Sequence, residues 1–132
     1  MLVKLLKSKL HRATVTDAIP DYPGSIRIDS ELTEAVGILP YESVLIADLD
    51  NGCRLETYVV PDDPGSGKIV ILGAAARLVK PGHKVIILSF GLFTEREAET
   101  FKPKIAVLDE NNRITKTSQL NTNDYTLYPI PL

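Results

Sequence analysis

The tripeptide Pro23-Gly24-Ser25 has residue types that suggest chemistry on the backbone itself. Glycine leaves its carbonyl sterically open, and the preceding proline restricts the chain, which would hold the next peptide bond in a strained turn. The Ser25 hydroxyl can then attack the Gly24 carbonyl and convert the peptide bond into an ester. Elimination from that ester leaves dehydroalanine, which hydrolyses to an amino-terminal pyruvoyl group. Most such tripeptides are nevertheless plain surface turns, in which the serine has no chemical role.

Other catalytic patterns are missing from the sequence. There is no glycine-rich phosphate loop, no helical His-Glu zinc motif and no Gly-x-Ser-x-Gly nucleophile elbow. His11 and His83 are the only imidazole bases, and no spacing supports a triad of Ser25, His11 and an acid. Cys53 is the only cysteine, which excludes an internal disulfide and a cysteine zinc site. We therefore expect no metal and a reducing, cytoplasmic setting.

The composition is that of one ordinary globular domain. The chain has 132 residues, of which 44% are hydrophobic and 24% charged, so we expect a single domain over residues 1–132. A formal net charge of -2 gives no basic surface for nucleic acid. Lysines within residues 1–7 interrupt the apolar run that a signal peptide needs. No stretch approaches the roughly 20 apolar residues of a membrane span, so we expect neither a nucleic-acid nor a membrane partner.

Short runs of β-forming residues alternate with strong turn signals along most of the sequence. The pattern predicts strands over residues 10–16, 26–28, 43–49, 54–60, 68–72, 84–90 and 104–108. Asn51-Gly52 lies between two of these runs, and such a pair readily takes the positive φ angles of a tight hairpin. This hairpin is the most specific structural prediction.

Two short helices are predicted between the strands. Asp29 or Ser30 can cap a helix that Gly37 ends, and Thr94 can cap a second helix over residues 94–101. Several short strands with few helices favour a mainly β fold in the form of a small closed barrel. Residues 118–132 are polar and punctuated by prolines, which is typical of a loosely held tail.

Several further motifs surround Gly24-Ser25 in a fixed order. They are Lys9-Leu10-His11-Arg12, Tyr22, Asn51-Gly52, Arg54, Thr57-Tyr58 and Gly73-Ala74-Ala75-Ala76. In order and spacing, from about Lys9 to Phe90, the set resembles the pyruvoyl-dependent aspartate 1-decarboxylase family of pantothenate synthesis. The resemblance implies that L-aspartate is converted to β-alanine and carbon dioxide by a homotetramer of six-stranded double-psi β-barrels. It also implies a pyruvoyl cofactor derived from Ser25, with neither metal nor pyridoxal phosphate.

The resemblance assigns a role to each matching residue. Self-cleavage at Gly24-Ser25 would give a β chain of residues 1–24 and an α chain of residues 25–132, with Thr57 supporting the cleavage. Tyr58 is similar to the family's proton donor, a task that suits a phenol. Arg54 is similar to the arginine that holds a substrate carboxylate. The other matches imply substrate contacts for Lys9, Thr57, Gly73, Ala74 and Ala75, and supporting roles for His11 and Tyr22.

Strand geometry adds a constraint that does not come from the resemblance. Successive side chains of a strand point to opposite faces, so Arg54 and Tyr58 should share a face while Thr57 points away. One site that uses all three residues requires a bulge, a strand end or two subunits. We therefore hypothesise that the sites lie at subunit interfaces of the homotetramer.

The sequence leaves three questions open. Leu72 stands where the family commonly has an asparagine before Gly-Ala-Ala, so a side-chain amide that can hydrogen-bond is missing. Cleavage is either spontaneous or assisted by a maturation factor. The alternative functions are a non-enzymatic β-barrel assembly module, in which Gly24-Ser25 stays an intact turn, and a pyruvoyl decarboxylase for another amino acid.

Overall fold

The computed structural model of the protein describes residues 1–119. Its strands are β1 Leu2–Thr14, β2 Asp17–Ile19, β3 Ser25–Asp29, β4 Ser43–Asp48, β5 Arg54–Asp62, β6 Ile69–Leu72, β7 Lys84–Thr94, β8 Lys104–Leu108 and β9 Ile114–Gln119. Its helices are α1 Ser30–Val36, the 3-10 helix η1 Ala74–Arg77 and α2 Glu95–Ala98. The prediction of a mainly β fold with a few short helices is confirmed. The predicted tail falls partly on β9, and residues 120–132 lie outside the described residues.

Over the described range, nine strands pair in the order β2-β6-β3-β5-β4-β7-β1-β8-β9. Most pairs are antiparallel, but β1 with β8, β2 with β6 and β3 with β5 are parallel. This arrangement differs from the expected closed ring of six strands, because β2 and β9 stand at the two ends of the order. The chain of β1 nevertheless continues through only Val15 and Thr16 into β2, which pairs at the opposite end of the sheet.

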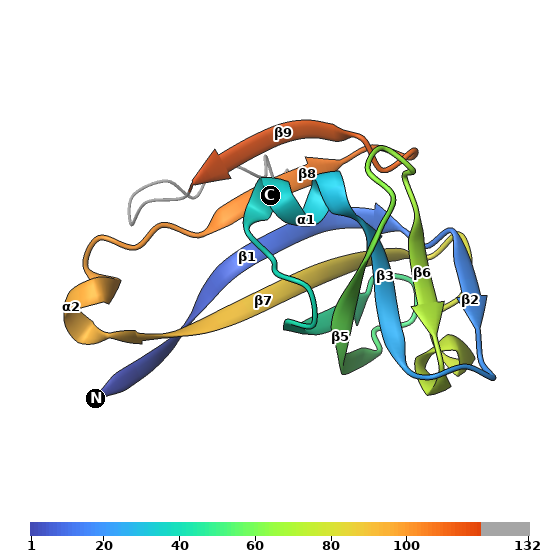
Figure 1. Ribbon diagram of the computed structural model, residues 1–132, viewed down its shortest axis with the longest axis horizontal. Helices are drawn as coiled ribbons and strands as arrows, with labels where there is room; N and C mark the ends of the chain where they lie inside the picture. The colour runs from blue at the N-terminus through green and yellow to red at the C-terminus, as the bar shows by residue number, and fades with distance from the viewer. Residues whose placement is uncertain (120–132) are drawn as a thin grey trace.

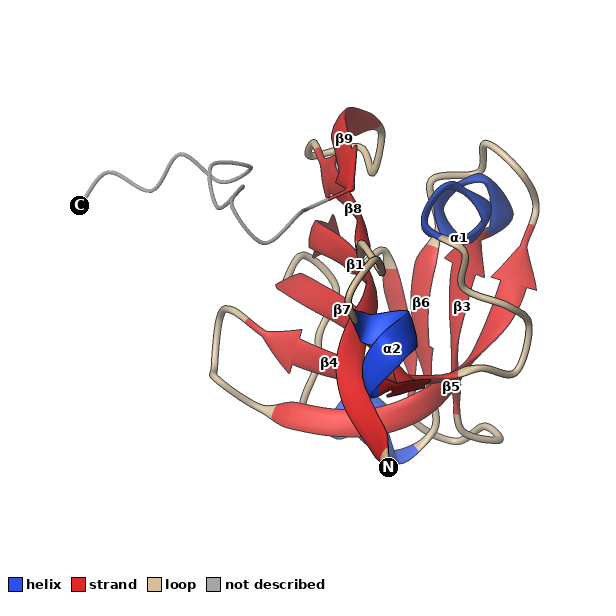
Figure 2. Ribbon diagram, turned by 90° about the vertical axis from the view of Figure 1, so that its left-hand side faces the viewer, coloured by secondary structure: helices blue, strands red, loops and turns tan. Residues whose placement is uncertain are grey.

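The longest strands form an arm that projects from the rest of the molecule (Figure 1). β1 and β7 pair from Leu2 opposite Thr94 to Thr14 opposite Lys84, and α2 lies at the outer end of this arm (Figure 2). The sequence predicted only the second half of β1, since lysines interrupt its apolar residues. In the structure these lysines lie on a strand that is only partly covered, which tolerates them.

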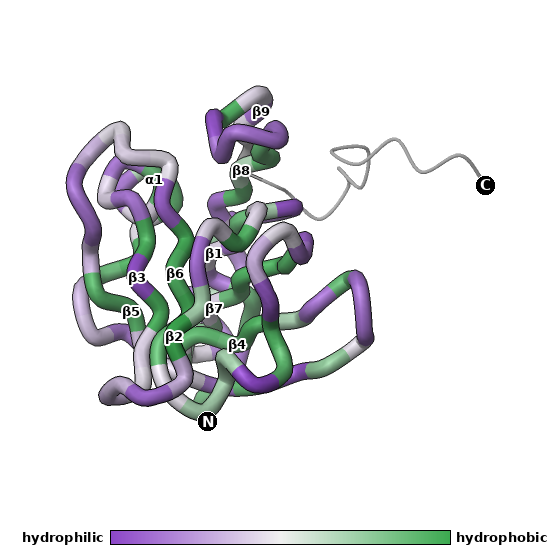
Figure 3. The backbone as a smooth tube through the Cα atoms, turned by 90° about the vertical axis from the view of Figure 1, so that its right-hand side faces the viewer, coloured by the Kyte–Doolittle hydropathy of each residue, from purple (hydrophilic) through white to green (hydrophobic). Residues whose placement is uncertain are grey.

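The hydrophobic core lies between the strands and α1. Branched aliphatic side chains supply most of it, and hydrophobic residues follow the central strands while hydrophilic residues gather at turns and along β9 (Figure 3). Fully buried members include Leu10, Ile26, Ile28, Ile46, Ile69, Ile71 and Ile87. Leu32 and Val36 of α1 complete the core on its helical side. No helix within residues 1–119 combines the length and the apolar character needed to span a membrane.

The hairpin between β4 and β5 is confirmed, although its turn differs in detail from the prediction. Gly52 adopts a φ of 76°, but Asn51 does not take a positive φ. The Asn51 side chain is used instead, because its Oδ1 accepts a hydrogen bond from Cys53 N at 2.9 Å and its Nδ2 donates to Leu78 O at 2.8 Å. The turn is therefore tied to the segment that follows η1.

Both predicted helices form, with the predicted caps. Asp29 accepts a hydrogen bond from Glu31 N at the start of α1, and Gly37 ends that helix with a φ of 74°. Thr94 and Glu97 form a capping box at α2. This second helix ends at Ala98, and the N–H groups of Thr100 and Phe101 just beyond it both donate to the Glu97 carbonyl.

The buried Asp29 carboxylate also organises the loop before β6. Its Oδ1 accepts a hydrogen bond from Gly65 N at 3.0 Å, and its Oδ2 accepts one from Gly67 N at 2.9 Å. Asn112 holds the same loop from the other side, since its Nδ2 donates to Gly67 O at 2.8 Å. These bonds satisfy backbone groups of a segment that has no regular structure of its own.

Candidate active site

Ser25 is the first residue of β3 and is only 5% exposed, whereas Gly24 is exposed. Ser25 therefore does not lie in a plain surface turn, as the serine of most such tripeptides does. Pairing with β6 buries the serine, because Ser25 lies opposite Leu72 in that antiparallel ladder. The Gly24-Ser25 bond thus joins an exposed turn to a strand held by its neighbours. Gly24 has no positive φ, so its backbone shows no left-handed strain.

Gly73 packs directly against the Gly24 backbone. A Cβ atom at Gly73 would lie 2.7 Å from Gly24 Cα, 3.1 Å from Gly24 N and 3.0 Å from the Tyr22 carbonyl oxygen. Gly73 also has a φ of 88° and a ψ of -153°, a conformation that only glycine adopts readily. A hydrogen bond of 2.9 Å from Gly73 N to Ile19 O holds it in place. The Gly73 segment therefore forms a close cradle for Gly24, the residue directly before Ser25.

The pairing of β3 with β5 brings Tyr58 near Ser25. This parallel pairing begins with Ile26 opposite Val59, and Ser25 and Tyr58 are the residues directly before that pair. Tyr58 is 40% exposed and pairs on its other side with Ser43 of β4. The local sequence around either residue gives no sign of this neighbourhood, since parallel pairing joins distant segments.

The side chains of β5 alternate between two environments, in agreement with the sequence analysis. Arg54, Glu56 and Tyr58 are exposed, whereas Thr57 is half-buried between them. The pairing of β4 with β5 runs without a register shift from Ser43 opposite Tyr58 to Ala47 opposite Arg54, so no bulge turns Thr57 toward Tyr58. Four residues of strand separate Arg54 from Tyr58 by about 13 Å along β5. One strand of one subunit therefore does not gather all three side chains.

Lys9 and His11 lie on β1, and three strands separate β1 from β3 in the sheet order. Burial lowers the pKa of Lys9, so its amine is less basic than usual. The pKa of His11 is lowered by burial first and then by the positive charges of Lys9 and Arg12, which favours a neutral imidazole at pH 7. The strand pairing does not bring these two residues beside Ser25.

The small residues after β6 form a junction between strand and helix. Ala74 and Ala75 begin η1, with Ala74 exposed and Ala75 half-buried. The first N–H groups of such a helix have no partner within it. Because Gly73 touches Gly24, these N–H groups lie in the segment that directly follows the cradle. Tyr22 is exposed beside the same segment, with its carbonyl oxygen close to Gly73.

Tyr41 was not predicted to lie near the site. This residue follows α1 and Pro40, and its ring centroid lies 6.4 Å from that of Tyr58. Its φ of 65° is left-handed and rare for a bulky residue. No local signal predicts this geometry, because the contact joins a loop to a strand that comes later in the chain.

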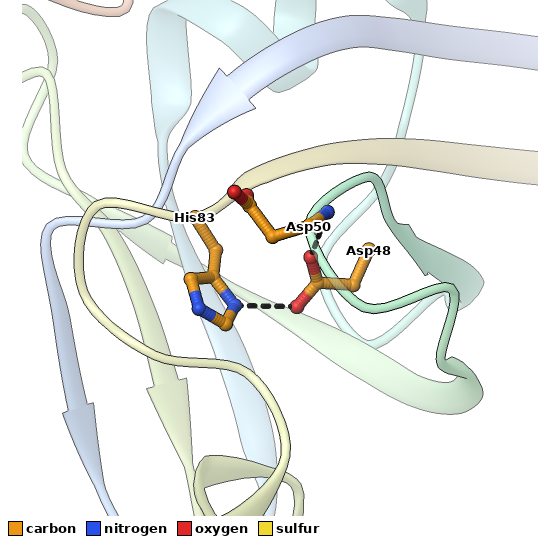
Figure 4. A group of neighbouring side chains, drawn as sticks. All are labelled: Asp48, Asp50 and His83. Carbon is orange, nitrogen blue, oxygen red and sulfur yellow. Dashed lines mark hydrogen bonds and ion pairs between the residues drawn. The ribbon is translucent and has the colours of Figure 1, made fainter.

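Asp48, Asp50 and His83 form a compact group at the β4–β5 hairpin (Figure 4). One ligand-type atom of each lies within 4.8 Å of the others. His83 Nδ1 is 2.7 Å from Asp48 Oδ2, and Asp50 N donates to Asp48 Oδ1 at 2.8 Å. Asp50 Oδ2 in turn accepts from Lys84 N at 2.8 Å. We interpret the group as a hydrogen-bonded support that ties the hairpin to the start of β7.

The sequence is similar to one protein family and to several known proteins. Residues 1–115 match the family model described as "Aspartate decarboxylase". The chain is 54% identical over 114 residues to "Aspartate 1-decarboxylase" of Acetivibrio thermocellus and to the protein of the same name from Listeria monocytogenes. It is 55% identical over 114 residues to that of Bacillus cereus. Each of these matches covers 86% of this chain and 90% of the relative.

Proposed function

The chain belongs to the aspartate decarboxylase family, and we propose that it cuts its own backbone between Gly24 and Ser25 to form a pyruvoyl group. The protein is a decarboxylase that acts on aspartate, and the proposed product is β-alanine for pantothenate synthesis. The cut yields a β chain of residues 1–24 and an α chain of residues 25–132. We further propose that it acts in the cytoplasm, as a single free cysteine would suit.

The contact between Gly24 and Gly73 carries this proposal. Ser25 pairs with Leu72 of β6, and β3 is also held by β5 from Ile26 onward, while Gly24 is confined by the Gly73 backbone. In the proposed cut, Ser25 Oγ bonds to the Gly24 carbonyl carbon, and the bond from that carbon to Ser25 N breaks. Loss of the Ser25 α-proton then releases the Gly24 carboxylate and leaves dehydroalanine. Water hydrolyses the dehydroalanine, ammonia leaves, and the pyruvoyl group remains on residue 25.

The surroundings of residue 25 fit such a group. A small planar group at the start of β3 would lie opposite Leu72, and the next residue, Gly73, has no side chain to crowd the adjoining Gly24 backbone. When formed, the pyruvoyl group supplies a ketone that combines with the substrate amine and accepts the electrons released as carbon dioxide departs. Tyr58, the sheet neighbour of residue 25, is the proposed proton donor.

The remaining residues are proposed to bind substrate or to assist cleavage. Arg54 offers a planar fork of donors to a carboxylate, and Lys9 adds positive charge, which favours a dianionic substrate. Thr57 assists cleavage and contacts substrate. Gly73, Ala74 and Ala75 allow close approach of the backbone N–H groups, while His11 and Tyr22 have supporting roles.

We propose a homotetramer in which adjacent subunits complete each site. Arg54 and Tyr58 share a face of β5 but lie about 13 Å apart, and the register excludes a bulge between them. We therefore propose that each site combines Arg54 of one subunit with Tyr58 of a neighbouring subunit. The continuous segment that links β1 to β2 suits the double-psi barrel that we propose for each subunit.

Denaturing mass spectrometry tests the proposed cut. We expect the purified protein to give fragments of residues 1–24 and 25–132, the larger of which carries a ketone in place of the Ser25 amine. Ser25→Ala should give only the intact 14.5 kDa chain. An intact wild-type chain after prolonged incubation, with and without cell extract as a source of a maturation factor, would reject self-cleavage. Carbon dioxide release from a panel of amino acids then distinguishes aspartate from other substrates.

A further inference from the structure

The loop between α1 and β4 brings a second tyrosine to Tyr58. The rings of Tyr41 and Tyr58 have centroids 6.4 Å apart and planes inclined at 34°. This separation lies within the range over which aromatic rings attract each other. Tyr41 is 75% exposed, so the ring pair lies at the surface. It links Tyr58 to a part of the chain outside its own strand.

Two backbone hydrogen bonds hold Tyr41 beside Tyr58. Tyr41 N donates to Val59 O at 2.7 Å, and Val59 N donates to Glu42 O at 3.1 Å. Because Val59 directly follows Tyr58 in β5, the loop is anchored one residue from the phenol. The left-handed backbone of Tyr41 persists only where the surrounding structure fixes it, and these two bonds do so.

The Glu42 carboxylate ties the same loop to the two long strands. One of its oxygens accepts hydrogen bonds from Lys7 Nζ at 2.7 Å and from Leu39 N at 3.2 Å. The other accepts one from Ser89 Oγ, and Ser89 is fully buried in β7. Lys7 of β1 also donates to Gly37 O at 2.9 Å, at the beginning of the loop. The support under Tyr41 is therefore rigid at both ends.

We propose that Tyr41 is a positioning residue for the Tyr58 phenol. The inference rests on the proposed function, in which Tyr58 delivers a proton to the substrate. An exposed tyrosine rotates about its side-chain bonds, and a ring packed against it removes part of that freedom before substrate arrives. Only the Tyr41 ring is needed for this effect, since its hydroxyl takes no part in the chemistry.

The test compares Tyr41→Gly with Tyr41→Phe. Glycine removes the ring and fits the left-handed backbone without strain, whereas phenylalanine keeps the ring. We expect Tyr41→Gly to lower kcat by about 2- to 10-fold, the factor that corresponds to one aromatic pair, and to leave KM unchanged. Tyr41→Phe should retain the original kcat. Leu39→Ala is the matched control, because Leu39 is 65% exposed in the same loop and its backbone N–H bond to Glu42 survives the change.

A second readout does not depend on turnover. In the uncleaved Ser25→Ala chain, the NMR signals of the Tyr58 ring should shift when Tyr41→Gly is added, since a neighbouring ring current is lost. They should not shift with Leu39→Ala. Unchanged Tyr58 signals, or an unchanged kcat in Tyr41→Gly, would overturn the positioning role.

The double variant separates this inference from the function on which it rests. If Tyr41 acts through Tyr58, adding Tyr41→Gly to Tyr58→Phe should lower kcat no further. A further decrease would reject the inference while leaving the donor role of Tyr58 intact. Normal turnover of Tyr58→Phe alone would instead reject the donor role, and the positioning role with it.

Discussion

Replacement of Gly73 by alanine tests the contact on which self-cleavage is proposed to depend. The added Cβ would lie 2.7 Å from Gly24 Cα, whereas ordinary van der Waals contact begins at 3.4 Å. The two backbone segments must therefore separate by about 0.7 Å, and neither atom belongs to a flexible side chain. A misplacement of about 1 Å at a reacting centre can cost on the order of 100-fold in rate. We expect cleavage of Gly73→Ala to slow by roughly that factor.

The same substitution should also destabilise the fold. A side chain at positive φ costs about 1–3 kcal/mol, and the crowding against Gly24 adds about 1–3 kcal/mol more. Gly82 provides a control, because its φ of 89° is close to the φ of Gly73 but nothing lies within 4 Å of an added Cβ. Gly82→Ala should therefore show the cost of a positive φ without the crowding, and it should cleave normally.

Two measurements distinguish these contributions. The fraction of intact chain, followed by denaturing mass spectrometry after synthesis, reports the cleavage rate of each glycine variant. Urea unfolding in the uncleaved Ser25→Ala background reports the two stability losses without interference from the cut. Equal cleavage rates in Gly73→Ala and Gly82→Ala would refute the role assigned to the cradle, whatever their stabilities.

Three further predictions concern other parts of the molecule. Tyr58→Phe should cleave normally but turn over aspartate more slowly. Mass spectrometry measures the cleavage, and carbon dioxide release measures the turnover. Burial raises the pKa of Glu42, but hydrogen bonds from Lys7, Ser89 and Leu39 together lower it below its usual 4.5. The ionised Glu42 carboxylate therefore stabilises the fold above pH 4.5, and this stabilisation is lost as the pH falls through the lowered pKa of the folded state. Urea midpoints of Glu42→Gln should accordingly be lower at neutral pH and fall less between pH 6 and pH 3 than those of the parent; a parallel pH dependence would contradict this. Asp29→Ala removes the acceptor of three backbone N–H groups, one at the start of α1 and two in the Gly65–Gly67 loop. This change should lower the free energy of unfolding by about 2–4 kcal/mol. A loss under about 1 kcal/mol would show that water replaces the carboxylate.

Local signals in the sequence predicted the features that depend on a few consecutive residues. The caps Asp29 and Thr94 are correct because a side-chain oxygen satisfies N–H groups only two or three residues away. The alternation of Arg54, Thr57 and Tyr58 is also correct, since it follows from the period of any strand. By contrast, β2 and β9 were missed, because three-residue and largely polar strands gain their structure from a partner strand.

The candidate site shows why non-local geometry is harder to predict. Ser25 and Tyr58 directly precede the first pair of a parallel pairing between segments some thirty residues apart, and no pattern within either segment encodes it. The burial of Ser25 was likewise not predicted, because it depends on pairing with the distant strand β6. Leu72, which stands where the resemblance leads us to expect an asparagine, lies opposite Ser25 in that pairing and is itself buried. Its side chain therefore makes the surroundings of the serine less polar than an amide would.

The position of the proposed cut also explains how the fold can survive it. Residues 1–24 contain β1, which pairs with both β7 and β8, and β2, which pairs with β6. Residues after the cut begin with β3, which is held by β5 and β6. Each side of Gly24-Ser25 is thus bonded to strands of the larger fragment, so breaking one peptide bond removes a connection but no strand pair. The small fragment should therefore stay in the sheet, and Lys9, a proposed substrate contact, should stay with it.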